Sequence, residues 1–238
     1  MEKQKSILSP QERRRRNRDR NREEMKAAIL DAARAVMREQ GVAALNLQEV
    51  ARRVGVRAPS LYEYFPGKMA LYDALFRMGV RLYAERSERL AQTSPSLWEY
   101  ARASLELYMT FAQEYPEFYQ LCFERPVPGF VPSEGSMDES RRFLTGRADQ
   151  MIEQGLEQGS LGPGVSPAQA RDLFLAMTHG LTALHMANEP ELPVGAGRFG
   201  SLIPAALALF QASWDPAGAQ RSPETGADSS DPSPHSQE

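Results

Sequence analysis

Several side chains able to make specific polar contacts lie within RAPSLYEYFPGK, residues 57–68. A phenol or an ammonium group near a helix start can reach a phosphate oxygen, which fixes the register of a complex without reading base sequence. Tyr62, Tyr64 and Lys68 carry those groups, and the hydroxyl of Ser60 can donate to a phosphate or to a base edge. A second interpretation of Tyr64 is that its ring only packs on the domain. The stretch indicates binding to a nucleic-acid backbone.

Side chains that could read bases are expected at the starts of two neighbouring short helices. Glutamine can pair bidentately with adenine and arginine with guanine, and small apolar groups can touch a thymine methyl. Gln48, Arg57, Ala58 and Pro59 have these chemistries. Asn46, which can cap the first of the two helices, completes the predicted DNA-facing set.

The residue patterns of known catalytic sites are missing from the sequence. It contains no Gly-rich phosphate loop, nucleophile elbow, paired metal-ligand motif or Ser-His-Asp order. His179 and His185 lie six residues apart, which is a poor spacing for two metal ligands on one helix. Cys122 is the single cysteine, which excludes an intrachain disulfide and fits a reducing cytoplasm. We expect no catalytic residue, metal or cofactor, and a helical enzyme with an accessory DNA-binding motif is the less favoured hypothesis.

The net charge of −3 over 238 residues combines two opposite parts. Residues 1–70 carry 16 Lys and Arg against 9 Asp and Glu, a charge of +7, and residues 71–238 carry 12 against 22, a charge of −10. This asymmetry favours a polyanion bound at one end of the chain. A nonspecific DNA-compacting protein would need basic charge throughout, and the acidic remainder argues against that class.

The polar N-terminus predicts a disordered basic arm over residues 1–22. Its consecutive arginines could enter a flanking minor groove, as basic arms do. They are Arg13, Arg14, Arg15 and Arg16. Nonspecific attraction to phosphates and a merely solvated charge run are the alternatives. The segment lacks the apolar block of a signal peptide, and no apolar run approaches the ~20 residues of a membrane span, so we expect a cytoplasmic protein.

Helical periodicity of the apolar residues predicts an all-α fold. A helix from about residue 21 ends at Gly41, and a short helix follows with Asn46 as its cap and Glu49 placed for a capping box. After a glycine turn, Pro59 opens a second short helix of roughly eight residues. This arrangement predicts a helix-turn-helix over residues 46–65, in which Leu61 and Phe65 face the core.

The remainder also reads as helices. The pattern predicts a connecting helix from Lys68 to about residue 91 and a short helix beginning at Pro116. The other predicted helices span 95–114, 137–158, 167–188 and 198–214. Pro, Ser, Gly and Asp dominate residues 215–238, which predicts a disordered tail.

From about Glu23 to Phe76 the chain resembles the TetR family of bacterial transcriptional regulators, and the segment that carries the resemblance is ILDAARAVMREQGVAALNLQEVARRVGVRAPSLYEYFPGKMALYDALF. It has the family's order of helix, glycine, capped short helix, turn, LYxxF, lysine and helix. Tyr62, Tyr64 and Lys68 match family positions that contact phosphates. Further along, YPEFYQLCF and MTHGLTAL resemble the subgroup with a Trp-His-Gly signature, although Thr178 stands in place of the tryptophan.

The resemblance implies a DNA-binding domain over 23–83 and an effector-binding and dimerisation domain over 84–214. It also implies a homodimer joined through the helices at about 167–188 and 198–214, each apolar around much of its circumference. Ordinary packing within one chain is the alternative for those apolar faces.

A cavity between helices of the second domain is expected to hold an unknown small-molecule effector. Its candidate lining is Tyr108, Phe111, Phe118, Tyr119, Phe123, Phe174, Met177 and His179. Plain hydrophobic core is the alternative for this aromatic set. The leading hypothesis is a homodimeric repressor that binds a pseudo-palindromic operator in double-stranded DNA and is released by the effector. A transcriptional activator of the same fold is the other possibility.

Overall fold

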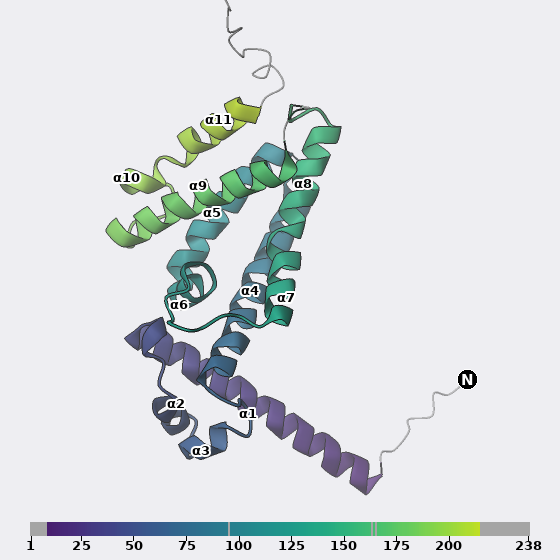
Figure 1. The fold of residues 1–238 in the computed structure, drawn as a ribbon, viewed down its shortest axis with the longest axis vertical. Helices are drawn as coiled ribbons and strands as arrows, with labels where there is room; N and C mark the ends of the chain where they lie inside the picture. The colour runs from purple at the N-terminus through teal and green to yellow at the C-terminus, as the bar shows by residue number, and fades with distance from the viewer. Residues whose placement is uncertain (1–8, 95, 163, 165, 215–238) are drawn as a thin grey trace, which may run out of the picture.

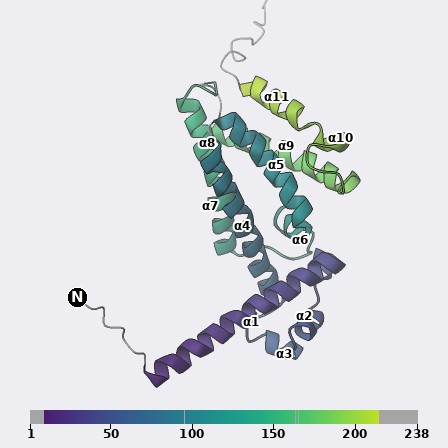
Figure 2. The ribbon, with the colours of Figure 1, turned by 180° about the vertical axis from the view of Figure 1, so that it is seen from behind.

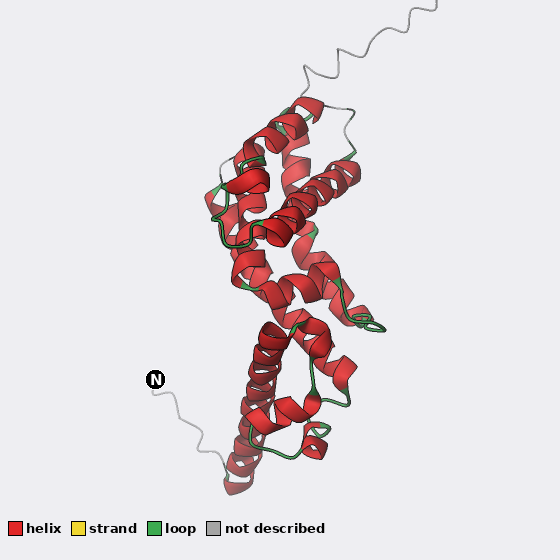
Figure 3. Cartoon of the chain, turned by 90° about the vertical axis from the view of Figure 1, so that its left-hand side faces the viewer, coloured by secondary structure: helices red, strands yellow, loops and turns green. Residues whose placement is uncertain are grey.

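The computed structural model describes residues 9–94, 96–162, 164 and 166–214, and this part of the chain is helical without strands (Figures 1 and 3). In chain order its helices are α1 (Pro10–Gln40), η1 (Val42–Ala44), α2 (Leu47–Arg53), α3 (Ala58–Leu61), α4 (Lys68–Thr93), α5 (Leu97–Glu114), α6 (Pro116–Tyr119), η2 (Gln120–Glu124), α7 (Glu134–Leu144), α8 (Gly146–Glu157), α9 (Pro167–Asn188), α10 (Gly197–Gly200) and α11 (Ile203–Trp214). The all-α prediction is confirmed. The predicted tail at 215–238 lies outside the described residues, and so do residues 1–8 of the predicted arm.

The prediction of a disordered arm is wrong for residues 10–22, which form the first half of α1. Ser9 caps this helix: its hydroxyl accepts from the amide of Glu12, and the Glu12 carboxylate accepts from the amide of Ser9. Pro10 follows at the first helical position. This capping box defines a helix start. Arginine is also a good helix former, so the basic run continues the helix.

The small N-terminal domain packs α1, α2, α3 and the start of α4 around one core. Its fully buried side chains include Ile29, Val36, Val50 and Leu71. As predicted, α1 ends at Gly41 and Asn46 caps α2, its side-chain oxygen accepting from the Gln48 amide at 2.8 Å. α2 and α3 lie beneath α1, on the side away from the second domain (Figures 1 and 2).

Two local predictions in the helix-turn-helix need correction. Glu49 does not complete a capping box, because its carboxylate accepts instead from Arg52 and Arg53. The second short helix, α3, has four α-helical residues and is continued by turns through Tyr64. Leu61 is buried as expected, whereas Phe65 is only half-buried, since it follows the end of the helix.

The second domain packs α5, α8 and α9 beside the upper part of α4 (Figure 1). The expected bounds of α9 are confirmed, but two predicted single helices are each broken in two. The first breaks at Thr145 between α7 and α8, and the second breaks between α10 and α11. Pro204 explains the second break, because a proline within the first turn starts a helix well but cannot continue one.

A continuous core joins the two domains through α4, α5 and α6. It contains Tyr72, Phe76, Phe111 and Phe118 together with the buried residues of α1. Gly79 allows the close approach of α6 and η2 to α4, since a Cβ there would lie 2.9 Å from the sulfur of Cys122. None of the helices in the described residues has the length and apolar character of a membrane span.

Candidate DNA interface and effector cavity

The polar tips of α2 and α3 face solvent. Gln48, Arg57 and Pro59 are exposed, and the side chain of Tyr62 is 57% exposed. Their neighbours Val50 and Leu61 are buried. The short helices therefore turn one face to the core and leave these side chains accessible on the other.

The remaining residues of the predicted DNA-facing set have less exposed surroundings. Ser60 is half-buried, and Ala58 is half-buried against the domain core. Asn46 is exposed but uses its side-chain oxygen in the cap of α2. Lys68 begins α4, where its ammonium group lies 3.5 Å from the carbonyl oxygen of Ala43 and 5.5 Å from the ring centre of Tyr72.

Tyr64 is partly packed, and its ring meets an arginine that the sequence analysis missed. Arg22 of α1 lies over the Tyr64 ring, 5.5 Å from its centre, and donates to the carbonyl oxygen of Glu63 at 2.7 Å. These contacts tie the basic half of α1 to the turns that follow α3, the second helix of the helix-turn-helix, which we call the recognition helix. No local pattern could have indicated them, since Arg22 and Glu63 are 41 residues apart in the chain.

A cluster of charges fixes α2 against α1. Arg53 donates to Glu39 at 2.6 Å and to Glu49 at 2.8 Å, and Arg52 donates to Glu49 at 2.7 Å. Hydrogen bonds first from Arg52 and then from Arg53 lower the pKa of Glu49 to about 2. Glu49 therefore stays ionised at neutral pH and neutralises these guanidinium groups.

The four consecutive arginines, residues 13–16, are exposed on α1. α1 extends well past α2 and α3 (Figures 1 and 2). At 1.5 Å per residue its 31 residues span roughly 46 Å. The arginines therefore lie on a long helix and not on an extended segment that could follow a minor groove.

A cavity of about 550 Å³ lies between α4, α5, α7, α8 and α9. Of the predicted lining residues, the structure places Tyr108, Phe123 and Phe174 on its wall. The other five do not line it. Three of them, Phe111, Phe118 and Tyr119, belong to the core that joins the domains. Met177 packs against α5 and α11. His179 contacts the hydroxyl of Tyr108 but does not itself line the cavity. The error arose because helical spacing alone does not separate a cavity wall from the core behind it.

Most of the residues on the actual wall were not predicted from the sequence. α5 contributes a face of residues spaced three or four apart, and α8 contributes a neighbouring pair. These residues are Leu97, Ala101, Ser104, Met151 and Ile152. The repeat along α5 was a detectable signal, but the matching contribution of α8 depends on tertiary packing.

Tyrosines give the cavity a neutral aromatic lining. The hydroxyl of Tyr108 and Nδ1 of His179 are 3.0 Å apart, and the ring of Tyr83 meets that of Tyr108 edge-on at 6.0 Å. Burial raises the pKa of both tyrosines, and it also raises the pKa of the Cys122 thiol. All three groups therefore stay protonated at neutral pH, and Cys122 is not set up as a reactive thiolate.

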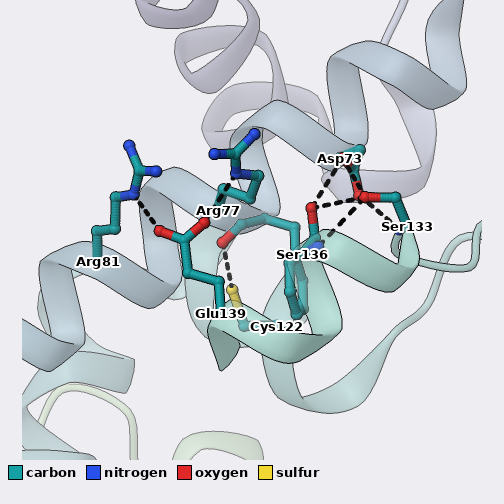
Figure 4. Close-up of polar contacts among 8 residues, drawn as sticks. Asp73, Arg77, Arg81, Cys122, Ser133, Ser136 and Glu139 are labelled. Carbon is teal, nitrogen blue, oxygen red and sulfur yellow. Dashed lines mark hydrogen bonds and ion pairs between the residues drawn. The ribbon is translucent and has the colours of Figure 1, made fainter. Parts of the chain in front are cut away.

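Polar contacts connect the cavity wall to α4, the helix that begins in the N-terminal domain (Figure 4). Asp73 accepts from the Ser133 amide at 2.7 Å and from the Ser136 hydroxyl at 2.8 Å. Arg77 lies one turn further along α4 and donates to Glu139 of α7 at 3.0 Å. Arg81 lies two turns further along and donates to the same carboxylate. We call these contacts the α4–α7 clasp.

A second connection runs from α1 to α6. Arg34 donates to Glu117 at 2.6 Å, and the Glu117 side chain is fully buried. The guanidinium of Arg34 also lies over the rings of Tyr115 and Phe118, 5.1 and 4.9 Å from their centres. Truncating one partner of such a pair leaves the other buried without its counter-charge, which is strongly destabilising.

A larger hollow of about 890 Å³ lies on the outer side of α4, α7 and α8. It is shallower and is lined mainly by charged residues such as Arg81, Glu85 and Arg142. Ligand sites are typically concave and mostly apolar. The more apolar cavity between α4, α5, α7, α8 and α9 is therefore the better candidate for a small molecule.

Comparison with known proteins gives consistent matches. The family model described as "Bacterial regulatory proteins, tetR family" matches residues 29–75. A curated relative, the HTH-type transcriptional activator FasR of Mycolicibacterium smegmatis, is 30% identical over 103 residues, 43% of this chain and 47% of that protein. The match thus spans about half the length of this relative.

Two solved structures share the fold. A protein of unknown function from Rhodococcus sp. RHA1 has a TM-score of 0.67 and 20% identity, over 80% of this chain and 94% of that one. The transcriptional regulator FadR from Bacillus subtilis, in complex with stearoyl-CoA, has a TM-score of 0.62 and 17% identity, over 77% and 96%.

Proposed function

This chain belongs to the tetR family of bacterial regulatory proteins and is a DNA-binding transcriptional regulator, and on that premise we propose that it is a homodimeric repressor released by a small molecule. The exposure of Gln48, Arg57 and Tyr62 beside the buried Val50 and Leu61 carries this proposal. Helices that are anchored on one face and polar on the other can enter a major groove. The family and its structural neighbours are regulators rather than enzymes.

In the proposed complex, the nine DNA-facing residues divide by role. Gln48 and Arg57 contact base edges, with Ala58 and Pro59 close to thymine methyl groups. Ser60, Tyr62, Tyr64 and Lys68 contact phosphates, and Asn46 holds the start of α2. Arg13, Arg14, Arg15 and Arg16 lie along the flanking phosphates from their positions on α1.

The proposed dimer forms through α9 and α11. α9 carries an apolar stripe at spacings of three and four residues, in which Leu173, Ala176 and Leu184 are exposed and Gly180 is half-buried. A Cβ at Gly180 would meet nothing within 4 Å, so another helix can approach closely there. Leu209 of α11 is 72% exposed. Apolar stripes of this kind support a protein–protein contact.

We propose that the effector releases the protein from DNA by moving the helices that line the cavity. α7 lines the cavity with Met137, Ser140 and Leu144, and it is held to α4 by the α4–α7 clasp. A molecule that separates α7 from α5 would shift α4 and with it the recognition helix. A ligand that prefers that arrangement by a few kcal/mol is sufficient to change operator occupancy.

Activation is the second candidate function, because the matched relative is named a transcriptional activator. A reporter gene under the selected operator distinguishes the two. Repression predicts that deleting the regulator raises expression, whereas activation predicts that it lowers expression. We propose that the protein acts in the cytoplasm, where its operator lies.

Binding-site selection with the purified protein tests the proposal directly. A two-fold dimer should select a pseudo-palindrome with half-sites about one helical turn apart, roughly 34–36 Å. Gln48→Ala and Arg57→Ala should each change the preferred base at one operator position by roughly 1–3 kcal/mol. A selected site without dyad symmetry would contradict the dimer.

A further inference from the structure

The effector cavity has a polar end and an apolar end. α5 and α9 lie side by side in register, since Tyr108 meets His179 and, further along both helices, Gln113 meets His185 at 3.2 Å. On this register Thr178 lies almost level with Tyr108, and Ser104 lies about one turn earlier, so both hydroxyls fall within about one turn of Tyr108. At the other end, Trp98 and Phe210 pack together with Phe174 in an apolar cluster.

The polar end holds two hydroxyl groups without hydrogen-bond partners in the described part of the chain. They belong to Ser104, which is 9% exposed, and Thr178, which is 3% exposed. Both residues line the cavity. Leaving a buried hydroxyl unpaired costs about 1–3 kcal/mol, so such groups normally have a partner. Two on facing helices point to a polar atom of a ligand between them.

The charge of the wall is also one-sided. Among the described residues, those lining the cavity include three arginines and no carboxylate. Two of the arginines are neutralised, Arg141 by Asp138 and Arg171 by Asp149. Arg125 has no ion pair within the described residues, and its guanidinium group donates to the sulfur of Met137 at 3.8 Å. Arg125 is exposed and supplies an unneutralised cation to the cavity wall.

Arg125 lies at the polar end and has an unusual backbone. Phe123, two residues before it, packs on Tyr108 with ring centres 4.9 Å apart. Arg125 has a φ of 52°, the left-handed region, and it is the one described residue other than glycine with a positive φ. Strain of this kind is concentrated at ligand-binding and active sites. The π-helical turn η2 holds it, because the Arg125 amide donates to Gln120 at 2.8 Å.

We propose that the cavity binds an amphipathic organic acid. Its carboxylate accepts from Arg125 and occupies the end where the hydroxyls of Ser104 and Thr178 can donate to it, and its hydrocarbon body runs along α5 to Trp98 and Phe210. Leu97 and Tyr108 are separated by about 16 Å of helix, which suits a medium-length chain. The inference rests on the proposed effector site and specifies the class of molecule that it takes.

Calorimetric titration of the full chain with three probes, each with an unbranched chain of ten carbons, tests this. Decanoate, decan-1-ol and decyltrimethylammonium have similar hydrocarbon tails and head groups that are anionic, neutral and cationic. Decanoate should bind about tenfold or more tightly than decan-1-ol, because hydrogen bonds to a charged group are the strong ones. Decyltrimethylammonium should bind most weakly. Equal affinities for the three probes, or preference for the cation, would overturn the inference.

Variants locate the head group. Arg125→Gln should weaken decanoate binding about tenfold and leave decan-1-ol binding unchanged. Ser104→Ala and Thr178→Val should weaken decanoate binding several-fold without lowering the melting temperature, because each removes a hydroxyl that has no partner in the free protein. Arg142→Gln, a charge change in the outer hollow, is the matched control and should alter neither affinity. Equal losses for decanoate and decan-1-ol in Arg125→Gln would overturn the inference.

Operator titrations with and without decanoate separate this inference from the proposed function. Decanoate binding without any change in operator affinity would support the ligand class and contradict release by the effector. Normal operator binding with no affinity for decanoate would overturn the ligand class while leaving the DNA-binding function intact.

Discussion

Leu61 and Tyr62 are consecutive residues of the recognition helix with opposite surroundings. Leu61 is 2% exposed in the domain core, and Tyr62 is 57% exposed. Spacing alone predicted this division, because residues four apart share a helix face. The partner of Tyr64 was not predictable in the same way, since Arg22 reaches it from a distant part of the chain.

Substitutions of Leu61 and Tyr62 should have different effects on stability and on DNA binding. Leu61→Ala should lower the free energy of unfolding by about 2–5 kcal/mol, because it leaves a cavity in a small core. Tyr62→Phe should leave thermal stability nearly unchanged and weaken operator and nonspecific DNA alike, as expected when a hydrogen bond to phosphate is removed. Thermal melts and DNA titrations measure both effects. If Tyr62→Phe melts the domain and spares DNA affinity, the faces of this helix are assigned the wrong way round.

At the scale of elements, α1 is the largest departure from the sequence-based expectation. Composition suggested disorder, but local capping chemistry at Ser9, Pro10 and Glu12 starts a helix. Composition averages over a window, whereas a helix start depends on a few residues at fixed spacing. The break between α10 and α11 has the same kind of cause in Pro204.

Removing residues 1–20 should weaken binding to every DNA sequence and flatten its salt dependence. Each phosphate that the protein no longer neutralises reduces the slope of log K against log salt by about 0.9. The core residues of α1 begin beyond the deletion, so the domain should remain folded. Replacing Arg13, Arg14, Arg15 and Arg16 by glutamine should reproduce most of the effect with the chain length kept. If the DNA affinity at moderate salt is unchanged, this part of α1 does not contribute to DNA binding.

The α4–α7 clasp should give the second domain a specific pH dependence. The guanidinium of Arg81, and then that of Arg77, lowers the pKa of Glu139 below its ordinary value near 4.5. A lowered pKa stabilises the folded state above the ordinary value, and this contribution is lost as the pH falls through the lowered pKa.

Glu139→Gln should therefore lower the melting temperature most at neutral pH. The difference from the natural chain should shrink as the pH falls below about 4.5. The same variant should change how strongly an effector alters operator affinity, because it loosens α7 from α4. Glu153→Gln removes an exposed carboxylate from α8 and serves as the control. A melting-temperature difference that is constant across pH would show that the ion pair contributes nothing.

In the whole molecule, the order of the helices could be predicted from the sequence, whereas the residues that line the cavity mostly could not. Helix periods are local, so α9 was predicted at its observed bounds. A cavity depends on which faces meet, and only Tyr108, Phe123 and Phe174 of the eight predicted lining residues border it. The Trp-His-Gly subgroup stays a prediction, with Thr178 on the cavity wall.

Leu209→Glu should convert the proposed dimer to a monomer, because it places a charge on each side of the two-fold contact. Sedimentation or light scattering gives the mass, and operator affinity should fall together with dimerisation. Val131→Glu is the matched control, since Val131 is equally apolar, 79% exposed and located in the loop before α7. A dimer that survives Leu209→Glu would place the interface elsewhere.

The aromatic cluster at the apolar end of the cavity has an optical consequence. The chain has two tryptophans, Trp98 and Trp214, and both pack on Phe210, with ring centres 6.3 and 6.0 Å away. All indole fluorescence therefore originates beside the cavity, and Trp98 is part of its wall. A hydrocarbon tail that replaces water there should shift the emission to shorter wavelength, and Trp98→Phe should abolish most of that shift. The protein thus contains its own spectroscopic reporter of ligand entry, which needs neither an added dye nor an operator.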